Sequence, residues 1–275
     1  MIKKHLIMCS VMLGIFLTAK MFIYSAPSSF VTLIYSREEP KKVENAIDPY
    51  YNSLSFAEET MPLGDTRITS KMKKALSAHS HKKLQTSRLH TQASKWFPII
   101  EPILAKYGIP EDFKYMPLVE SGLKAGISPK GAAGFWQFMP QTARDFGLRV
   151  NSDIDDRNNI QKSTIAAAKY IKSLYREFNS WTLAAAAYNV GEGRLKRQIN
   201  SQNQDNYFKM SLNRETASYV YKLISMKEII ENPTRYGYSS RVNRLLAKSE
   251  TRQQPAFPYP VAKGKPLGNN AMLIN

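Results

Sequence analysis

Residues 159–189 read NIQKSTIAAAKYIKSLYREFNSWTLAAAAYN, and this stretch decides the fold class. Asn159 is a favoured N-cap residue, and the apolar side chains after it recur at the three- and four-residue spacing of a long amphipathic helix. The segment from Trp181 to Asn189 is rich in alanine, the residue with the highest helix propensity, and predicts a second helix. Glycines at positions 191 and 193 mark its end. The stretch therefore predicts two consecutive helices.

The same helical spacing continues on both sides of this stretch. Further helices are predicted over residues 96–107, 110–122, 132–146, 194–200 and 215–231. Pro98 and Pro102 confine the start of the first of these helices, and Pro140 breaks the third. Pro233 stops the last one. No segment has the two-residue alternation of a strand, so we expect an all-α domain over residues 93–238.

The segments outside this domain differ from it in composition. Residues 1–26 begin with Lys3 and Lys4 and continue with an uncharged apolar run, which predicts a secretory signal peptide or an uncleaved signal-anchor. Residues 27–65 show no sustained period and are interpreted as a mostly irregular linker. Residues 239–275 are polar, basic and dotted with proline, so we expect a disordered tail. The N-terminal segment over residues 1–26 predicts export to the periplasmic side of a cell envelope.

Residues 66–92 form a separate basic segment. Lysine and arginine are frequent from residue 66 to residue 95, and Asp and Glu are absent there. Loosely spaced apolar residues predict that the segment is helical. It is either a solvated basic helix or a contact surface for an anionic membrane or cell wall. The formal net charge of the whole chain is +17, which favours attraction to nucleic acid, anionic lipid or the acidic stem peptides of cell-wall glycan.

The helical domain lacks several kinds of catalytic side chain. The four histidines stand at positions 5, 79, 81 and 90, and Cys9 is the only cysteine. A Ser-His-Asp triad, a Cys-His pair and a His-rich zinc site are therefore excluded between residues 93 and 238. The acidic loop with Asp153, Asp155 and Asp156 offers too few oxygen ligands for calcium. We expect chemistry by carboxylates, amides and hydroxyls, with no metal and no cofactor.

Glu120 is the main catalytic candidate. It follows Leu118 and Val119 at the end of the helix predicted over residues 110–122. Burial and the negative end of the helix dipole both disfavour an ionised carboxyl there. A carboxyl that keeps its proton near neutral pH can act as a general acid, which suits cleavage of the bond between two sugars. The alternative is a solvent-exposed glutamate at a helix end.

Polar groups elsewhere in the domain could line a sugar-binding groove. Ser121 offers a hydroxyl beside the candidate acid, and Gln137 stands among aromatic residues, where its amide could bind an acetamido group. Tyr188 and Asn189 end the Ala-rich helix, whose small side chains allow close packing. Each of these residues also has a structural interpretation, as a surface glutamine or a core tyrosine with one hydrogen bond.

Four strings follow one another along the chain: YMPLVES (115–121), GAAGFWQFMP (131–140), AAYNVGEG (186–193) and RETASYV (214–220). Together they resemble the lytic murein transglycosylases of the soluble-lytic-transglycosylase, or goose-lysozyme-like, superfamily. The resemblance covers residues 95–237. It implies a lysozyme-like helical fold that acts on the glycan strands of peptidoglycan.

The resemblance also implies a reaction without water at the β-1,4 bond between N-acetylmuramic acid and N-acetylglucosamine. Glu120 would protonate the leaving oxygen while the acetamido group of the substrate stabilises the positive centre. The same carboxylate would then take the proton of the C6 hydroxyl, which attacks C1 and closes a 1,6-anhydro ring. One carboxyl group therefore suffices, whereas most glycosidases need two.

The matched positions extend the candidate substrate site. With Ser121 and Asn189, they are Ser128, Gln137, Met139, Tyr188, which is implied near the acetamido group, and Glu215, which is implied in the cleft. Capping and the helix dipole would also account for an acid at the start of the helix over 215–231. The stretch from Glu120 to Ser128 is one residue shorter than usual and lacks an Asn-Pro pair, so the role of Ser128 stays open. The tail shows no LysM-like repeat, and residues 66–95 could supply wall affinity instead.

Other functions remain open from the sequence. A hydrolytic muramidase on the same fold needs a second carboxylate about 5 Å or roughly 6.5–9.5 Å from Glu120; candidates are Asp145, Asp153 and Glu215. A non-catalytic peptidoglycan-binding envelope protein is the second alternative. Charge alone favours a nucleic-acid binder, but no nucleic-acid motif is present. We expect a monomer.

Overall fold

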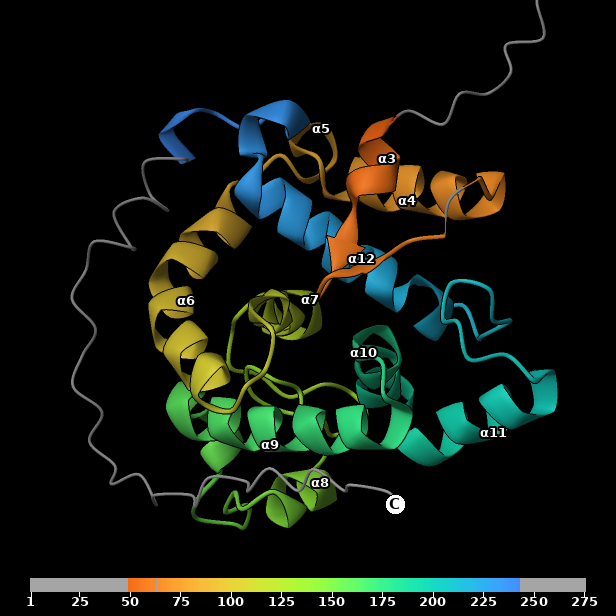
Figure 1. The fold of residues 1–275 in the computed structure, drawn as a ribbon. Helices are drawn as coiled ribbons and strands as arrows, with labels where there is room; N and C mark the ends of the chain where they lie inside the picture. Colours follow the sequence, from red (N-terminus) through yellow and green to blue (C-terminus); the bar gives the residue numbers. More distant parts are fainter. Residues whose placement is uncertain (1–48, 63, 243–275) are drawn as a thin grey trace, which may run out of the picture. The chain divides into compact units, whose positions relative to one another are not determined.

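The computed structural model describes residues 49–62 and 64–242, which are mostly helical (Figure 1). The longer helices are α4 (Thr66–His79), α6 (Arg88–Lys106), α9 (Ile160–Phe178), α10 (Trp181–Val190), α11 (Glu192–Gln202) and α12 (Thr216–Glu231). The shorter ones are α3 (Pro49–Ser53), α5 (His81–Leu84), α7 (Met116–Ser121), α8 (Pro140–Asp145), and the 3-10 helices η1 (Glu111–Tyr115), η2 (Asp156–Asn158) and η3 (Pro233–Tyr236). The prediction of an all-α fold is confirmed, apart from one small hairpin.

The predicted N-terminal segment over residues 1–26 lies outside the described residues, as does most of the predicted tail. Within the described part of the chain, no helix is both long enough and apolar enough to cross a membrane.

Helix α12 is the central element of the core. Its buried side chains include Tyr219, Val220, Tyr221, Leu223, Ile224 and Met226, which point in all directions around the helix axis. A helix that is apolar on every side is enclosed by other elements. It packs against α4, α10 and α7, and Figure 1 shows α4 on one side of it and α7 and α10 on the other. This arrangement brings the end of α7 against α12.

An irregular linker was expected over residues 27–65, of which residues 27–48 lie outside the described part of the chain. The described residues before α4 pack into the core, which corrects this expectation for them. After α3, strands β1 (Ser55–Phe56) and β2 (Glu59–Thr60) form an antiparallel hairpin. The main core includes Leu54, Phe56 and Met61. The segment is too short to show a period, and contacts with distant residues hold it in place. The expectation of no strands was therefore also wrong here.

Glu59 ties this hairpin to the start of α10. Its carboxylate accepts hydrogen bonds from the backbone N–H groups of Trp181 and Thr182, the latter at 3.0 Å. It also accepts from the hydroxyls of Ser180 and Thr182, at 2.8 and 2.7 Å. The first N–H groups of a helix have no helical partners, so Glu59 caps α10 from a distant part of the chain.

We expect Glu59→Gln to lower the free energy of unfolding by about 1–2 kcal/mol. The substitution replaces one accepting oxygen by an NH2 group that faces other donors. Urea unfolding of the full chain measures the change. Glu58 is exposed in the same hairpin, and Glu58→Gln should change the free energy by no more than about 0.5 kcal/mol. Equal effects of the two substitutions would contradict the capping role.

Helix α6 starts at Arg88, earlier than the expected start near Trp96, and both Pro98 and Pro102 lie inside it. Each proline removes one helical hydrogen bond. The helix nevertheless buries a row of side chains against α9, η1 and α7, and this packing outweighs the loss. Residues 88–92 therefore belong to α6 rather than to the separate basic segment, whose other residues form α4 and α5.

Residues 131–139 form a loop, although a helix was expected over residues 132–146. Gly131 and Gly134 have φ angles of +84° and +79°. Helical residues have negative φ, so two left-handed glycines close together prevent a helix. Only α8, which begins at Pro140, is helical in this region.

The described fold continues beyond the expected boundary at residue 238. Tyr238 and Val242 are buried against Ile229 of α12. The Tyr238 hydroxyl also donates a hydrogen bond to the backbone oxygen of His79, at 2.6 Å. The first residues of the predicted tail, up to 242, therefore pack on the domain.

Candidate active site

The Glu120 carboxyl is half-buried near the end of α7, just before Gly122 ends the helix with a φ of +63°. Its Oε1 accepts a hydrogen bond from the Tyr219 hydroxyl at 2.5 Å. The pKa of Glu120 is raised from its ordinary 4.5 to about 7, mainly by burial and also by the charge of Glu215. The Tyr219 hydrogen bond and the charge of Lys222 lower it. A large share of Glu120 therefore keeps its proton at neutral pH.

Tyr219 lies in the helix predicted over residues 215–231 and was not among the candidate site residues. It is buried, with 2% of its surface exposed, yet its hydroxyl is the hydrogen-bond partner of Glu120. A buried tyrosine usually needs a partner for its O–H group. This requirement was the available sequence clue, although it does not identify the partner.

We expect Tyr219→Phe to raise the pKa of Glu120 above about 7, by up to about one unit. The hydrogen bond from Tyr219 favours the ionised carboxyl, so its removal favours the protonated form. Carbon-13 NMR titration of the Glu120 side-chain carboxyl measures the shift. Tyr221 lies two residues further along α12, and its buried hydroxyl has no hydrogen-bond partner among the described residues. Tyr221→Phe should therefore leave the titration unchanged, and a shift of the same size in this control would refute the assignment.

Tyr188 lies within electrostatic reach of Glu120. Burial raises its pKa well above the ordinary value of 10, and the charge of Glu120 adds to this shift. Its hydroxyl donates a hydrogen bond to the backbone oxygen of Trp136 at 2.8 Å, and its ring packs against Phe138 and Tyr170. The phenol is therefore held in place, and its oxygen can still accept a hydrogen bond.

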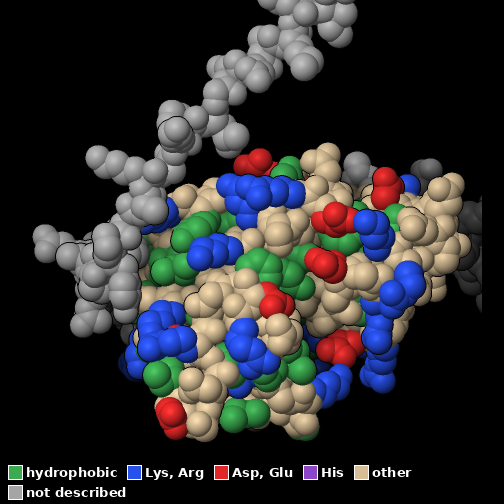
Figure 2. Space-filling view, turned by 90° about the horizontal axis from the view of Figure 1, so that it is seen from below, with side chains coloured by type: hydrophobic (Ala, Val, Ile, Leu, Met, Phe, Trp, Pro, Cys, Tyr) green, Lys and Arg blue, Asp and Glu red, His purple; other side chains and the backbone are tan. Residues whose placement is uncertain are grey.

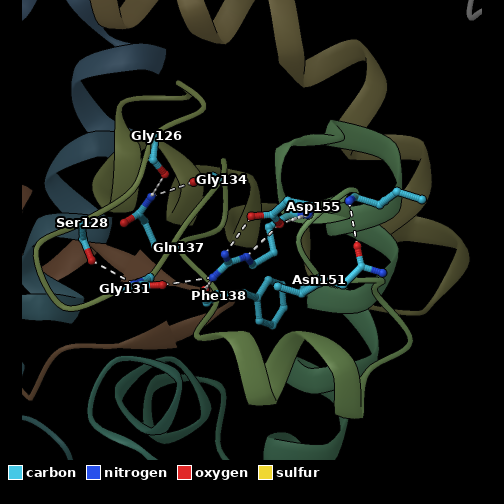
Figure 3. Close-up of polar contacts among 12 residues, drawn as sticks. Gly126, Ser128, Gly131, Gly134, Gln137, Phe138, Asn151 and Asp155 are labelled. Atoms are coloured by element: carbon cyan, nitrogen blue, oxygen red, sulfur yellow. Dashed lines mark hydrogen bonds and ion pairs between the residues drawn. The ribbon is translucent and has the colours of Figure 1, made fainter.

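Gln137 extends from the 131–139 loop, where its own φ is +49°. Its Nε2 donates to the backbone oxygens of Gly134 at 2.8 Å and Gly126 at 3.3 Å (Figure 3). These contacts occupy both N–H groups of the amide. The carbonyl oxygen of the side chain has no partner among the described residues, so the group that Gln137 offers a ligand is an acceptor.

Arg157 holds the 131–139 loop in place by hydrogen bonds. It was not among the candidate residues predicted from the sequence. Its side chain is buried, and Nη1 donates to the backbone oxygens of Gly131 and Phe138, both at 3.0 Å (Figure 3). Its Nε and Nη2 bind the carboxylate of Asp155 at 2.9 and 2.7 Å. Asp155, a residue of the acidic loop, thus orients the guanidinium. Among the described residues, no group of His, Cys, Asp and Glu could hold a metal ion.

The two candidate serines form hydrogen bonds within the loop region. Ser121 Oγ lies 2.8 Å from the backbone oxygen of Phe135 and 3.0 Å from that of Pro117. Ser128 Oγ accepts from the backbone N–H of Ala132 at 3.0 Å. Both hydroxyls therefore maintain the shape of the loop. Met139, at the start of α8, has 46% of its surface exposed and is open to a ligand.

Asn189 and Glu215 lie together at the start of α12. Asn189 Oδ1 accepts from the Thr216 hydroxyl at 3.1 Å, and its Nδ2 lies 3.5 Å from Glu215 Oε1. Lys130 Nζ lies 4.0 Å from the other oxygen of Glu215. The capping interpretation of Glu215 was wrong, because the side chain of Asn213 accepts from the N–H groups of residues 215 and 216 instead.

Of the three carboxylates considered as partners of Glu120, only Glu215 acts on it electrostatically. Asp145 accepts a hydrogen bond from Gln141 at 2.8 Å, and Asp153 accepts one from Ser152 at 3.1 Å. The structure therefore places Tyr219, Tyr188 and Glu215 close enough to Glu120 to interact with it electrostatically. The loop that carries Gln137 lies next to Tyr188, because the Tyr188 hydroxyl binds the backbone oxygen of Trp136.

Comparison with known proteins gives the following matches. Residues 98–211 match the family model described as Transglycosylase SLT domain. Membrane-bound lytic murein transglycosylase D of Escherichia coli (strain K12) is 34% identical over 153 residues, which cover 54% of this chain and 33% of that protein. The putative tributyltin chloride resistance protein of Alteromonas sp. (strain M-1) is 35% identical over 133 residues, which cover 46% of this chain and 64% of that protein.

Among solved structures, the 70 kDa soluble lytic transglycosylase of Escherichia coli is similar with a TM-score of 0.42 and 16% identity. The match covers 67% of this chain and 39% of that one. The chain spans 33% of the length of the transglycosylase D to which it is similar. The family resemblance predicted from the four strings is confirmed by the family model and by this relative.

Proposed function

We propose that this chain, whose residues 98–211 match the family model described as Transglycosylase SLT domain, is a peptidoglycan lytic transglycosylase. It cleaves the β-1,4 bond between N-acetylmuramic acid and N-acetylglucosamine and leaves a 1,6-anhydro end on the muramic acid. The observation that carries this proposal is the half-buried Glu120 carboxyl, which Tyr219 binds and whose pKa is about 7. A carboxyl in this state can both give and take a proton near neutral pH.

In the first step, Glu120 donates its proton to the glycosidic oxygen while the bond from C1 to that oxygen breaks. The leaving sugar keeps the bonding electrons and gains the proton, and the acetamido oxygen of the muramic acid stabilises C1. Glu120 becomes a carboxylate, which the Tyr219 hydroxyl and the positive charge of Lys222 stabilise. The groups that lower its pKa are thus those that favour proton release.

In the second step, the C6 hydroxyl of the muramic acid attacks C1 and forms the anhydro ring. Its proton passes to the Glu120 carboxylate, which restores the starting state. No water is consumed, so the reaction needs no second carboxylate to activate a water molecule. Glu215, with 62% of its side chain exposed, is assigned to the cleft and to the electrostatic tuning of Glu120.

We assign the remaining site residues according to which of their hydrogen-bond acceptors have no partner among the described residues. The free carbonyl oxygen of Gln137 accepts from the N–H of an acetamido group, and the phenol oxygen of Tyr188 offers a second acceptor. Met139 contributes apolar contact to a sugar ring. Ser121, Ser128 and Asn189 act through the loop and the start of α12, because their side chains are bonded there.

Mass spectrometry of the soluble products tests this proposal directly. Purified cell-wall sacculi are digested with the full chain, and the released fragments should carry the mass of anhydro ends. Products heavier by one water would identify a hydrolytic muramidase instead. Binding to sacculi without any released product would favour a non-catalytic envelope protein.

The hydrolytic alternative is favoured by one observation, the effect of the Glu215 charge on Glu120. In that reaction Glu215 would act on water or on the sugar. Glu215→Gln would then abolish the products that are heavier by one water. In the lytic reaction the same substitution removes a charge that raises the pKa of Glu120, and turnover persists.

We further propose that the chain is exported through residues 1–26 and acts as a monomer in the periplasm on glycan strands, without nucleic acid as a partner. The name of the Escherichia coli relative, membrane-bound lytic murein transglycosylase D, supports an envelope location.

A further inference from the structure

A pocket of about 740 Å³ lies between α4 and α12, and its lining does not include Glu120, Gln137 or Tyr188. It is lined by Lys71, Lys74, Ala75, Ala78, His79, Arg214, Glu215, Ala217, Ser218, Tyr221 and Lys222. The alanines and the tyrosine ring form apolar wall, while lysine and arginine supply four positive charges. The Lys71 ammonium lies over the Tyr221 ring, 5.9 Å from its centroid. The pocket therefore has a mainly apolar lining with four cations among its residues.

The cations of this pocket form no ion pairs with carboxylates of the described residues. In the described part of the chain, no carboxylate lies within ion-pair distance of the following cations: Lys71, Lys74, Arg214 and Lys222. The one acid of the pocket, Glu215, lies 4.0 Å from Lys130 of the loop. Figure 2 shows another face, on which Lys and Arg side chains are spread out with Asp and Glu between them. A concave group of unpaired cations attracts anions more strongly than such a mixed surface.

The pocket adjoins the candidate active site. Glu215 lines the pocket and also acts electrostatically on Glu120. The charge of Lys222 acts both on Glu120 and on His79, a residue of the pocket lining. One ligand bound beside Glu120 can therefore contact these cations through a substituent, and no second ligand is needed.

We propose that this pocket binds the carboxylates of the peptide attached to the muramic acid, next to the bond that is cleaved. This inference rests on the proposed function and names the part of the substrate that gives it selectivity. The stem peptide is the anionic substituent of an otherwise uncharged glycan, and a pocket of this volume accommodates a short peptide. Glu215 at its edge can accept from a peptide amine.

A flat membrane surface fits the pocket less well than a peptide does. The pocket lysines flank a concavity, which a peptide can enter and a bilayer surface cannot follow. Lys82 and Lys83 of α5 are exposed and lie outside the pocket, so they provide a control pair with the same loss of charge. Deletion of residues 66–92 is unsuitable as a test, because it would remove the core residues Ile68, Met72 and Leu76.

The test compares two double variants of the full chain on two substrates. The pocket variant is Lys71→Gln with Lys74→Gln, and the control variant is Lys82→Gln with Lys83→Gln. One substrate is glycan strands that carry stem peptides. The other is the same strands after an amidase has hydrolysed the amide bond to the peptide, which removes the peptide and its carboxylates and leaves one lactyl carboxylate on each muramic acid. Exposed lysines tolerate glutamine on a helix, and equal thermal midpoints of all three proteins verify that each is folded.

The pocket variant should show about a tenfold higher KM than wild type on peptide-bearing strands, which corresponds to the loss of charge-assisted hydrogen bonds. Its KM on peptide-free strands and the behaviour of the control variant should match wild type. Equal losses on both substrates, or in both variants, would overturn the inference while leaving the lytic activity intact. A defect confined to binding of anionic phospholipid vesicles would also overturn it. Failure of wild type to release anhydro products from either substrate would instead refute the proposed function.

Discussion

Glu120→Gln is expected to lower kcat by roughly 10²–10⁴-fold, the contribution of a positioned general acid. Gln keeps the shape of the side chain and can still accept the hydrogen bond from Tyr219, but it has no proton to give. Binding to sacculi should persist, because the groove is unchanged. Release of anhydro products measured by mass spectrometry gives the rate, and Glu58→Gln serves as the matched control at an exposed position. A Glu120→Gln variant with near wild-type turnover would exclude this carboxyl as the acid.

The pH dependence of the wild type follows from the same group. The first step of the proposed reaction needs the protonated carboxyl, whose pKa is about 7. The rate should therefore be highest below this value and fall about tenfold per pH unit above it. An enzyme whose rate stays constant well above pH 7 would contradict the raised pKa.

Glu120→Gln should also stabilise the protein at alkaline pH. Between pH 4.5 and about 7 the carboxyl ionises in the unfolded chain but keeps its proton in the fold, so the wild type loses stability as pH rises through this window. Glutamine has no such penalty. We expect the variant to be more stable than wild type by about 1–3 kcal/mol at pH 8, as measured by urea unfolding, with no difference below pH 4.5.

Gly134→Ala is expected to cause the largest structural defect, about 3 kcal/mol or more of lost stability. A Cβ at this position would lie 1.9 Å from the backbone oxygen of Arg157 and 2.4 Å from its carbonyl carbon. Neither is the end of a flexible side chain, so the backbone itself would have to move. The loop that carries Gln137 would lose its position, and turnover should fall together with the midpoint of urea unfolding.

Gly131→Ala provides the control for backbone strain. Gly131 lies in the same loop with a φ of +84°, but nothing is within 4 Å of a Cβ built there. Its replacement should cost only about 1 kcal/mol, the penalty of a left-handed alanine. If both alanine variants lose the same stability, the contact with Arg157 does not determine the effect.

The position and environment of Glu120 could be predicted because they depend on local sequence. Leu118 and Val119 precede it, and Gly122 ends the helix within a few residues. Local burial and helix-end position are properties that a single segment encodes. The long helix after Asn159 was predictable for the same reason, and the Asn159 side chain does accept from the N–H of Lys162.

The hydrogen-bond partners could not be predicted, because they depend on segments far apart in the chain. Tyr219 lies 99 positions after Glu120, and its stripe of apolar neighbours indicates only burial. The hairpin at residues 55–60 is stabilised by Glu59 contacts with α10, which no local pattern reveals. The aromatic residues of the 131–139 loop form a pattern that predicts the apolar face of a helix. Gly134 and the buried Arg157 determine the path that the loop takes instead.

The capping of α10 by Glu59 determines where this chain can be truncated or fused to another protein. The span that matches the family model, residues 98–211, contains Glu120 but omits both the hairpin and α12. A fragment trimmed to that span would leave the acid without its phenolic partner and α10 without its first-turn acceptor. A unit that keeps these contacts reaches at least from the hairpin to the end of α12, and fusion proteins or chimeras should be joined outside these limits.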